Sequence, residues 1–414
     1  MVYDWIVIGN GITGAAVSYE LARLGLSVLL LEQDKYPNSA TRHSYGGIAY
    51  WSGTTPLMKQ ICREGIKRHR QLSDELGYST QLRELDLLLA VPIDLDPASM
   101  ALDYADCDIQ PQPISRDQAI EMEPLLNKDA IAAAFTVSHG HVDPVETVRA
   151  YNHGFIQANG TLRIQKVTGF LRSGDTAKAQ AIQHITGVTT ATKSFHCQNV
   201  VVCTGGWTRH FLHAAGIPFH QCFTHAESVE LSIPEDESDR IQLNTIVTTA
   251  NLQRFALEHR GGNTSRCDEW NQPDQELTPY ILDAGAIQFA NGQIRIGQIS
   301  RVLTNPSVRI DATNSEQEIR TQVGQLLPIL QNQPGEWCHC LVAFSGDGLP
   351  LIGPIPKMSG IYLFSGFGNP FSLVPPLAQR FVQQFAQQAA QPDPQNNHKS
   401  DPLLDAMNPE RFLR

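Results

Sequence analysis

The chain has 414 residues, which is too long for one small module and is typical of two or three units of about 100–200 residues. Hydrophobic residues make up 42% and charged residues 18%, with 31 Gly and 25 Pro, a balance that excludes a coiled coil, a collagen-like repeat and a mainly disordered chain. The 31 Lys and Arg against 42 Asp and Glu give a net charge of −11, so we expect no nucleic-acid partner.

The eight cysteines and fourteen histidines show no CxxC or HExxH spacing, so we expect no metal site and no disulfide scaffold. The most apolar stretch, Val2–Leu31, contains Asp4, Glu20 and Arg23 and does not open on a basic segment. It is therefore a poor signal peptide and a poor membrane span. We expect a soluble, cytoplasmic protein with reduced thiols and no integral membrane segment.

The N-terminal segment has the pattern of a βαβ unit. Tyr3–Ile8 is a short apolar run, typical of a buried strand, and it leads directly into the sequence GNGITG at Gly9–Gly14. A helical stretch, Ala15–Leu24, and a second apolar strand, Leu26–Leu31, follow, and Glu32 comes directly after that strand. This order predicts a dinucleotide-binding unit, and the alternative is a βαβ turn that binds no nucleotide.

Each glycine has a role in such a unit. Gly9 allows the tight turn, Gly11 lets a pyrophosphate approach the backbone, and Gly14 lets the helix pack against the strand. The free N–H groups and the positive dipole end of the helix then face the phosphates. Glu32 can accept hydrogen bonds from a pair of ribose hydroxyls, and it argues against a 2′-phosphate, which would require an arginine.

The rest of the chain alternates between predicted strands, helices and loops, and is richest in strands over Ile217–Gln298. In chain order the predicted elements are a strand Gln81–Val91, a loop Pro97–Pro113, a helix Ile114–Glu123, a helix Val145–Ala158 capped by Asp143, a strand Thr161–Val167, a strand Asn199–Val202, a hairpin Ile287–Ile296, a helix Gln317–Leu327, a strand Ile361–Phe364 and a helix to about Ala390. Two of the strands lead into glycine turns, Thr204–Trp207 and Ser365–Gly368. The Gln/Asn/Pro-rich segment Ala390–Ser400 is expected to be mobile.

Seven segments, in chain order, carry a resemblance to one family. They are GNGITG with Glu32, TRHSYGGI (Thr41–Ile48), GHVDP (Gly140–Pro144), VVCTGGW (Val201–Trp207), DGLPLIGP (Asp347–Pro354), LFSGFGNP (Leu363–Pro370) and NPERF (Asn408–Phe412). The chain resembles the FAD-dependent amine and amino-acid oxidoreductases of the D-amino-acid oxidase superfamily, which includes glycine oxidase, sarcosine oxidase and D-amino-acid dehydrogenase.

The resemblance implies an α/β protein with a Rossmann-like FAD-binding domain and an inserted, sheet-rich α+β substrate domain. The FAD-binding domain would comprise residues 1–80, 141–215 and 328–414, and the substrate domain residues 81–140 and 216–327. The implied cofactor is FAD. The residues that would bind it are Gly9, Gly11, Ile12, Thr13, Gly14, Glu32, Gln33, Thr41, Arg42, Ser44, Gly46, Gly47, Val167, Thr204, Gly205, Trp207, Cys340, Gly348, Gly366, Phe367, Gly368, Asn369 and Pro370.

Some of these residues also have a simpler interpretation. Gly366 and Gly368 precede a helix, so their N–H groups and the helix dipole could stabilise negative charge on a reduced flavin, but the same turn can form without a ligand. Val167 can be an ordinary strand valine and Trp207 a core residue. Cys340 lies seven residues before Asp347, the spacing at which sarcosine oxidase-like enzymes attach FAD covalently, and it can equally be a small buried thiol.

In this family the flavin accepts a hydride equivalent from a C–H next to an amine nitrogen, and most members bind the substrate carboxylate with a cation. The chain departs from that pattern. It has Val342 where glycine oxidase-like members have an Arg, Pro370 where sarcosine oxidase-like members have a Lys, and Phe367 where they have a His.

Arg301, two residues past the predicted strand Gln293–Ile299, is the best substitute cation, and its alternative is a solvated surface arginine. His225 and Glu227 are further candidates for the substrate pocket. Arg42 and His43 lie in the segment that resembles a phosphate loop and are expected to serve FAD.

The predicted function is oxidation of the C–N bond of a small amine or N-substituted amino acid to an imine, with oxygen or a quinone-type electron acceptor. One alternative is an FAD-dependent dehydrogenase of 2-hydroxy acids or alcohols, in which a base such as His225 would take the hydroxyl proton. Another is a flavin-binding assembly protein or RNA-modifying protein, against which the net charge and the lack of a basic stripe count.

Overall fold

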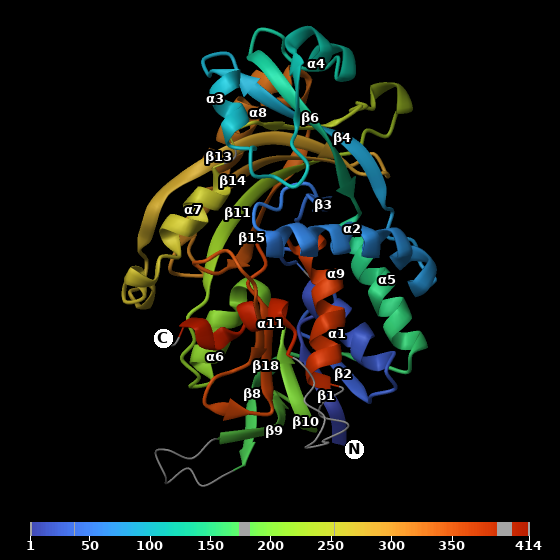
Figure 1. Ribbon diagram of the computed structural model, residues 1–414, viewed down its shortest axis with the longest axis vertical. Coiled ribbons are helices and arrows are strands. Elements are labelled where there is room, and N and C mark those ends of the chain that lie inside the picture. Colours follow the sequence, from blue (N-terminus) through green and yellow to red (C-terminus); the bar gives the residue numbers. More distant parts are fainter. Residues whose placement is uncertain (1, 37, 174–182, 252, 387–399, 413–414) are drawn as a thin grey trace.

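Two nine-stranded sheets dominate the fold in the computed structural model, which describes residues 2–36, 38–173, 183–251, 253–386 and 400–412. The first sheet lies in the lower half of the molecule and the second, strongly curved sheet in the upper half (Figure 1). The first sheet has the order β16-β18-β10-β1-β2-β7, with β8, β9 and β17 beside it. The second has the order β15-β11-β14-β13-β12-β4-β6-β3, with β5 paired to β6.

The strands of the first sheet are β1 Val2–Ile8, β2 Val28–Glu32, β7 Thr161–Ile164, β8 Val167–Ser173, β9 Gln183–Thr190, β10 Ser194–Val202, β16 Leu351–Pro354, β17 Met358–Ser359 and β18 Ile361–Ser365. Those of the second sheet are β3 Gly47–Ile48, β4 Arg83–Pro92, β5 Gln112–Ser115, β6 Ile131–His141, β11 Cys222–Leu231, β12 Ile246–Thr249, β13 Glu276–Gln288, β14 Ile294–Leu303 and β15 Gly335–Phe344. The α-helices are α1 Ile12–Ala22, α2 Pro56–Leu76, α3 Pro97–Leu102, α4 Arg116–Met122, α5 Pro144–Gln157, α6 Thr208–Ala214, α7 Arg254–Gly261, α8 Ala312–Leu326, α9 Pro370–Phe381 and α11 Pro402–Ala406.

The N-terminal βαβ unit forms as predicted. β1 pairs in parallel with β2 on one side and with β10 on the other, and the residues of β2 are all buried. α1 is apolar on nearly all sides because it packs between the sheet and the helices α5 and α9. The unit therefore sits in the core of the molecule, with its loop at the carboxyl ends of the strands.

Helix α2 crosses α9 at close range. It begins at Pro56 after the cap residue Thr55, whose side chain accepts from the N–H of Met58, and it ends at Leu76, where Gly77 with φ +64° forms the C-cap. A Cβ on Gly65 would lie 2.0 Å from the carbonyl oxygen of Ser372, so the backbones can approach this closely only with glycine there.

One face of the second sheet is covered by α8, which packs on β13 and β14 (Figure 1). The hairpin between β13 and β14 turns at Asn291-Gly292, with Gly292 at φ +91°, as the sequence predicts. β11 carries an irregularity between Glu227 and Ser228, where its register with β14 shifts by one residue.

The predicted fold class is confirmed, and several predicted elements need correction. The predicted loop Pro97–Pro113 contains the short helix α3, which Asp96 caps by accepting from two backbone N–H groups. The predicted helix Ile114–Glu123 begins two residues later, because its first residues pair with β6 as part of β5. The single predicted strand Thr161–Val167 is two strands, β7 and β8, which join different partners. The end of the last predicted helix and most of Ala390–Ser400 lie outside the described residues.

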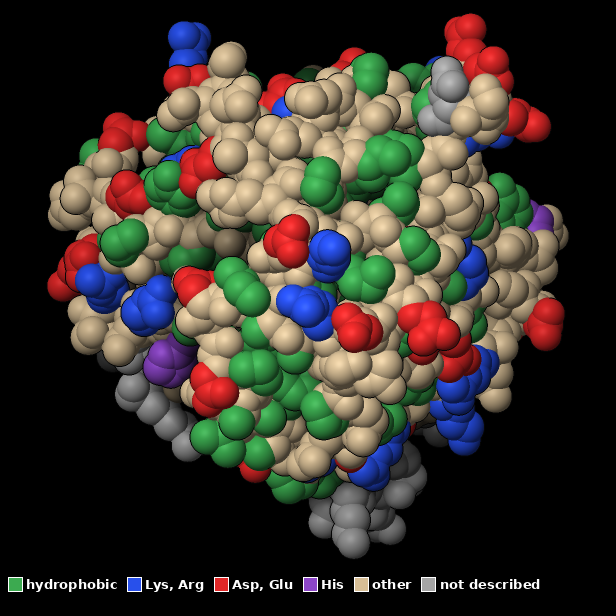
Figure 2. All heavy atoms as spheres, turned by 90° about the horizontal axis from the view of Figure 1, so that it is seen from above, with side chains coloured by type: hydrophobic (Ala, Val, Ile, Leu, Met, Phe, Trp, Pro, Cys, Tyr) green, Lys and Arg blue, Asp and Glu red, His purple; other side chains and the backbone are tan. Residues whose placement is uncertain are grey.

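The domain boundaries remain a prediction. Sheet membership follows them except at β3 and β15, which fall in the chain ranges predicted for the FAD-binding domain but belong to the second sheet. Within the described part of the chain, no helix combines the length and the apolar character needed to span a bilayer. The face seen from above carries acidic and basic side chains interspersed, without a continuous basic patch among the coloured residues (Figure 2).

Candidate active site

The loop between β1 and α1 is held in shape by its glycines. Gly9 has φ +99°, and a Cβ on it would lie 2.6 Å from the carbonyl oxygen of Cys203 at the end of β10. A Cβ on Gly14 would lie 1.8 Å from the oxygen of Gly9. A Cβ on Gly11 would meet only Thr41 Oγ1, at 3.0 Å. The loop is therefore packed tightly against the protein at Gly9 and Gly14 and leaves its backbone open at Gly11, which suits the approach of a phosphate.

Glu32 closes this loop from the second strand. Its carboxylate accepts hydrogen bonds from the N–H groups of Asn10 and Gln33, both at 2.7 Å. At the start of α1 the N–H of Ile12 donates to Thr41 Oγ1 at 3.1 Å. The segment after β2 is thus fastened to the N-terminus of α1, and the binding of ribose by Glu32 stays a prediction.

A cavity of about 550 Å³ opens beside this loop, between the two sheets. On the side of the first sheet it is lined by the starts of α1 and α9 and by the glycine turn before α9. Neither helix has an acidic residue in its first turn, so both dipoles present positive potential there. The residues predicted to bind the cofactor that line the cavity are Ile12, Thr13, Thr41, Ser44, Gly47, Gly205, Cys340, Gly366, Phe367, Gly368, Asn369 and Pro370.

The other predicted cofactor residues lie outside the cavity lining. They are Gly9, Gly11, Gly14, Glu32, Gln33, Arg42, Gly46, Val167, Thr204, Trp207 and Gly348. Val167 is buried in β8, Trp207 is exposed beside His210, and Gly348 lies in a turn with φ +74°.

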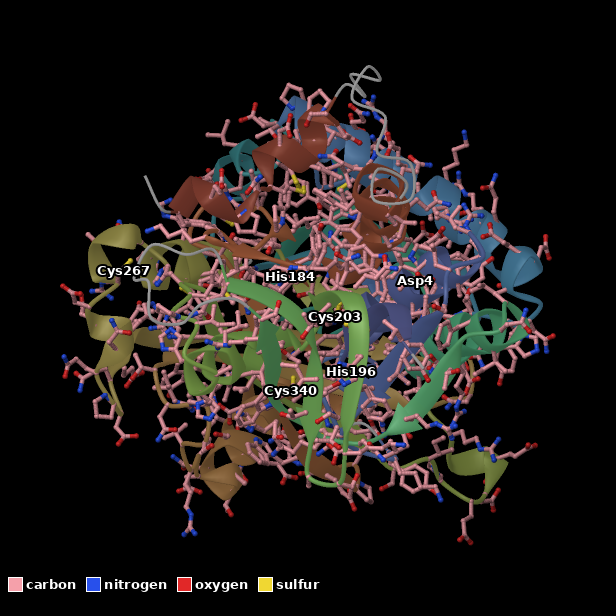
Figure 3. All side chains as sticks on the ribbon, turned by 90° about the horizontal axis from the view of Figure 1, so that it is seen from below. Asp4, His184, His196, Cys203, Cys267 and Cys340 are labelled. Atoms are coloured by element: carbon pink, nitrogen blue, oxygen red, sulfur yellow. The ribbon has the colours of Figure 1, made fainter. Side chains whose placement is uncertain are left out.

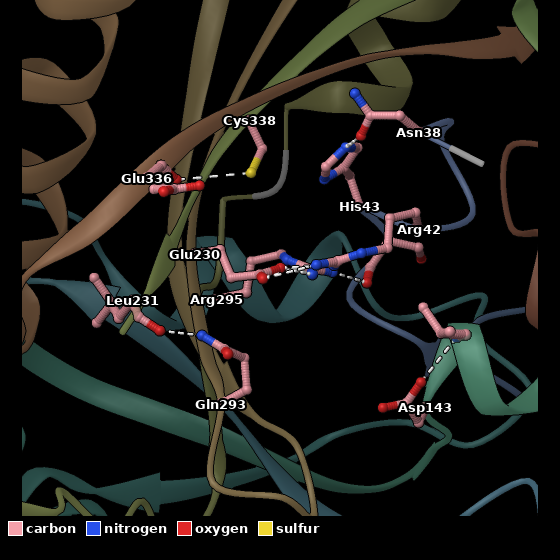
Figure 4. Close-up of polar contacts among 12 residues, drawn as sticks. Asn38, Arg42, His43, Asp143, Glu230, Leu231, Gln293, Arg295, Glu336 and Cys338 are labelled. Atoms are coloured by element: carbon pink, nitrogen blue, oxygen red, sulfur yellow. Dashed lines mark hydrogen bonds and ion pairs between the residues drawn. The ribbon is translucent and has the colours of Figure 1, made fainter. Parts of the chain in front are cut away.

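The segment 39–47 is fixed to the second sheet by an ion-pair network (Figure 4). Arg42 donates to both carboxylate oxygens of Glu230, at 2.8 and 2.9 Å, and Arg295 donates to the same carboxylate and to the carbonyl of Ser44. The bonds from Arg42 lower the pKa of Glu230 to about 2, and the carboxylate in turn raises the pKa of Arg42. Arg42 is therefore committed to Glu230 in this structure, and its predicted role toward FAD would be indirect, through the position of the loop.

His43 lies on the cavity side of the same segment. One ring nitrogen contacts Asn38, and the other, Nδ1, is buried without a partner among the described residues. Burial lowers the pKa of His43 to about 4, so its imidazole is neutral near pH 7.

The structure does not bring Arg301 and His225 to the cavity, because neither is among the residues that line it. They are cross-strand partners on β14 and β11. Arg301 Nε donates to Glu227 Oε1 at 2.7 Å, and its guanidinium lies over the ring of Tyr280 and reaches Ser315 of α8. The prediction of Arg301 as the substrate cation therefore finds no support in this geometry, since its charge compensates the fully buried Glu227.

His225 stacks on His339 with a ring separation of 5.0 Å, and its Nδ1 lies 2.8 Å from His339 Nε2. Burial lowers the pKa of His225 to about 4. A histidine at this position has no access to a substrate in the cavity, so the geometry does not support it as the base of a hydroxyl-oxidising enzyme.

One cationic side chain, which the sequence did not indicate, lines the cavity. Arg254, at the start of α7, is the single Arg or Lys among the described residues that line it. Arg254 donates to the carbonyl of Gly368, and its Nε lies 3.4 Å from Glu258 Oε1. Asp283 of β13 accepts from the N–H groups of Gln253 and Arg254 and so holds the start of this helix.

The second-sheet side of the cavity is mainly apolar. Its polar residues are His139 on β6, the pocket candidate Glu227 with Ser228 on β11, Thr248 on β12, Asp283 on β13 and Gln298 on β14. Neither Arg254 nor His139 was predicted from the sequence as a site residue. α7 falls in the region predicted to be rich in strands and loops, and His139 lies one residue before the GHVDP segment, outside the part that carries the family resemblance. Each reaches the cavity only through pairing or packing with distant segments.

Cys340 lines the cavity and is buried, and burial raises the pKa of its thiol to about 12. Cys340 and Cys203 lie near the middle of the molecule, whereas Cys267 is at its edge (Figure 3). The thiol of Cys340 is thus held in its unreactive form near pH 7, as expected of a small buried cysteine.

The site fits a flavin dinucleotide. It combines a glycine cradle that a side chain would fill at Gly9 and Gly14, an open backbone at Gly11, and two helix N-termini bordering one cavity. In the described part of the chain no three His, Cys, Asp or Glu residues gather as metal ligands would.

Comparison with known proteins agrees with this geometry. The family model for FAD dependent oxidoreductases (DAO) matches residues 4–384, and the chain belongs to that family. In this chain the flavin of that family would be held by the β1–α1 loop, the segment 39–47 and the turn before α9.

Two relatives and one solved structure illustrate the similarity. The chain is 26% identical over 244 residues to 4-methylaminobutanoate oxidase (formaldehyde-forming) of Paenarthrobacter nicotinovorans, covering 56% of this chain and 28% of that protein. It is 28% identical over 223 residues to one subunit of the anaerobic glycerol-3-phosphate dehydrogenase of Escherichia coli (strain K12), covering 52% of this chain and 39% of that protein. The chain thus matches well under half the length of these two relatives.

The crystal structure of L-proline dehydrogenase from P. horikoshii has the same fold. Its TM-score is 0.73 at 20% identity, with 100% of this chain and 98% of that chain covered.

Proposed function

We propose that this protein oxidises the C–N bond of a small amine or N-substituted amino acid to an imine, which water then hydrolyses. The observation that carries the proposal is the cavity, which joins the turns proposed to bind flavin to a largely apolar wall with one arginine, Arg254, and the acidic residues Asp103, Glu227 and Asp283. Bound FAD supplies a hydride acceptor at N5, so the chain itself needs to position the substrate and exclude water.

Arg254 is proposed to bind a substrate carboxylate. A guanidinium has five N–H donors, and the contacts of Arg254 with Gly368 and Glu258 leave others free. Its side chain is 24% exposed, so it is accessible without being fully solvated. At the positions where family members usually have the cation, this chain has Val342 and Pro370. Arg254 on α7 would supply the positive charge from a different element.

The names of two relatives support this substrate class. The 4-methylaminobutanoate oxidase and the L-proline dehydrogenase are named for compounds that are secondary amines with a carboxylate. Oxygen or a quinone-type compound is the proposed electron acceptor.

Oxidation of a 2-hydroxy acid or another alcohol is the second candidate, favoured by the similarity to part of a glycerol-3-phosphate dehydrogenase. That reaction requires a base for the hydroxyl proton. The base suggested by the sequence, His225, is stacked on His339 outside the cavity lining, which counts against this candidate.

Anaerobic bleaching of the flavin absorption band tests the proposal. The panel contains N-methyl amino acids, D- and L-amino acids, the corresponding amines without a carboxylate, and 2-hydroxy acids. Rapid bleaching by N-substituted or primary amino acids is the expected result. Bleaching by 2-hydroxy acids alone, or by dithionite alone, would overturn the proposal.

The role of Arg254 is tested with Arg254→Met and Arg254→Lys. Loss of a charge-assisted hydrogen bond costs about 1.5–3 kcal/mol, so Arg254→Met is expected to raise KM for carboxylate substrates roughly tenfold to a hundredfold. KM for matched amines without a carboxylate should stay within about threefold of the wild-type value. Arg260→Met, on the exposed surface of the same helix, is the control and should behave as wild type.

A further inference from the structure

His139 and Trp51 form a pair in the wall of the cavity on the side of the second sheet. Both residues line the cavity and both side chains are buried. Trp51 Nε1 donates to His139 Nδ1 at 3.1 Å. An indole nitrogen can only donate, so Nδ1 of His139 must be the acceptor.

This hydrogen bond fixes the tautomer of His139. Burial lowers the pKa of the imidazole to about 4, so the ring is neutral near pH 7 and carries one proton. Because Nδ1 accepts from Trp51, that proton is on Nε2. His139 is therefore a hydrogen-bond donor at Nε2, and its acceptor lone pair is already used.

His139 lines the cavity, and Nε2 is the ring nitrogen that the bond from Trp51 leaves unused. Nε2 of His139 has no hydrogen-bond partner among the described residues. His141 Nε2 and His225 Nε2 also lack a partner, but those two atoms are fully buried, whereas His139 Nε2 is not. A Cβ on Gly47 would lie 2.7 Å from Nε2, so glycine at this position leaves room for the ring. The sequence assigned Gly47 to a phosphate loop, and the structure gives it this second role.

The surroundings make a donor at this position selective. The wall residues Leu87, Ile246 and Ile287, which belong to the same hydrophobic cluster as Trp51, are apolar and offer no hydrogen bond. An N–H that faces an apolar pocket favours a ligand with an acceptor atom and penalises one without, because an unpaired donor is costly.

We propose that His139 determines substrate specificity, with its Nε2–H donating a hydrogen bond to an oxygen acceptor of the bound substrate while Trp51 fixes the tautomer. The inference rests on the proposed function, since it identifies a second contact in the same substrate site. His139 does not act as a general base, because its lone pair at Nδ1 accepts from the Trp51 N–H.

The test compares ligand binding in four variants of the FAD-loaded protein. His139→Leu removes the donor, and His139→Gln keeps an N–H near the Nε2 position. Trp51→Phe removes the N–H that fixes the tautomer of His139. His141→Gln, two residues along β6 and outside the cavity lining, is the matched control. The probe is benzoate, whose binding is followed by the change in the flavin absorption band and needs no turnover.

His139→Leu is expected to raise the Kd of benzoate roughly tenfold or more, and Trp51→Phe by a smaller factor. His139→Gln and His141→Gln should stay within about threefold of the wild-type value. With a substrate found by bleaching, KM should follow the same order while kcat changes little.

Equal weakening by His139→Leu and His139→Gln would show a structural role and overturn the proposal. An unchanged Kd in His139→Leu, equal weakening by His141→Gln, or no benzoate binding by the wild type would also overturn it. Failure of the bleaching panel refutes the proposed amine oxidation alone, because benzoate binding is measured without any reaction.

Discussion

Replacing Glu230 by glutamine removes the carboxylate that joins the segment 39–47 to the second sheet. Arg42 and Arg295 both donate to this carboxylate. Arg295 is only 2% exposed, so the substitution leaves a buried charge without a counter-ion. We expect Glu230→Gln to lower the free energy of unfolding and to weaken FAD binding, because the same segment lines the cavity through Thr41 and Ser44.

The size of the effect follows from the pKa of Glu230, which falls from 4.5 to about 2. A change of that size corresponds to about 3 kcal/mol. Arg42 is 38% exposed and Glu230 19%, so solvent screens part of the interaction and we reduce this contribution to about 1–2 kcal/mol. The unpaired Arg295 adds to the loss, which gives about 2–4 kcal/mol in total.

The pH dependence has a definite sign. The pKa of Glu230 is lower in the folded protein, so its contribution is fully present above the unfolded value of 4.5 and is lost as the pH falls toward about 2. The difference in stability between wild type and Glu230→Gln should therefore be constant near pH 7 and shrink below about pH 4.5.

Urea unfolding followed by far-UV circular dichroism, at several pH values, measures this difference. Glu336→Gln is the control, since Glu336 is exposed on β15 directly opposite Glu230 in the sheet register. It should change stability by less than about 0.5 kcal/mol. Equal stability of wild type and Glu230→Gln at pH 7, or a difference that stays the same at pH 3, would refute the reasoning.

Two further predictions concern the cofactor. Gly14→Ala should raise the Kd of FAD at least about tenfold in a fluorescence titration, because the new Cβ would lie 1.8 Å from the Gly9 oxygen and force α1 away from the loop. Gly169→Ala on β8 is the control and should bind FAD as wild type does, because its new Cβ would meet only a side-chain oxygen, at 3.2 Å. A normal Kd for Gly14→Ala would contradict the close packing. Cys340→Ser should keep the flavin content of the wild type and the same fraction released by acid, because burial raises the pKa of this thiol to about 12 and suppresses the thiolate; a gain in acid-released flavin would show a covalent bond through Cys340.

The local parts of this protein could be predicted from the sequence. The β1–α1–β2 unit, the cap at Asp143 and the turn at Asn291-Gly292 depend on residues close together in the chain. Glycines that need positive φ or close approach, and side chains that satisfy the first N–H groups of a helix, act within a few residues. The same motifs also identified the FAD-dependent family, which the family comparison confirms.

The substrate side of the site was decided by tertiary structure. Strand register places His225 opposite Arg301, and Arg301 forms an ion pair with the buried carboxylate of Glu227. Arg254 reaches the cavity from the start of α7. Trp51 and His139 are 88 residues apart and meet only because β3 pairs with β6 and the chain then turns back.

Which face of a strand meets a cavity depends on its register and on irregularities such as the one at Glu227 and Ser228. A shift of one residue exchanges the two faces, and no local pattern of residue types records that choice. The sequence by itself therefore determined the cofactor and the family, and the packing and pairing of distant segments decided which polar groups line the cavity.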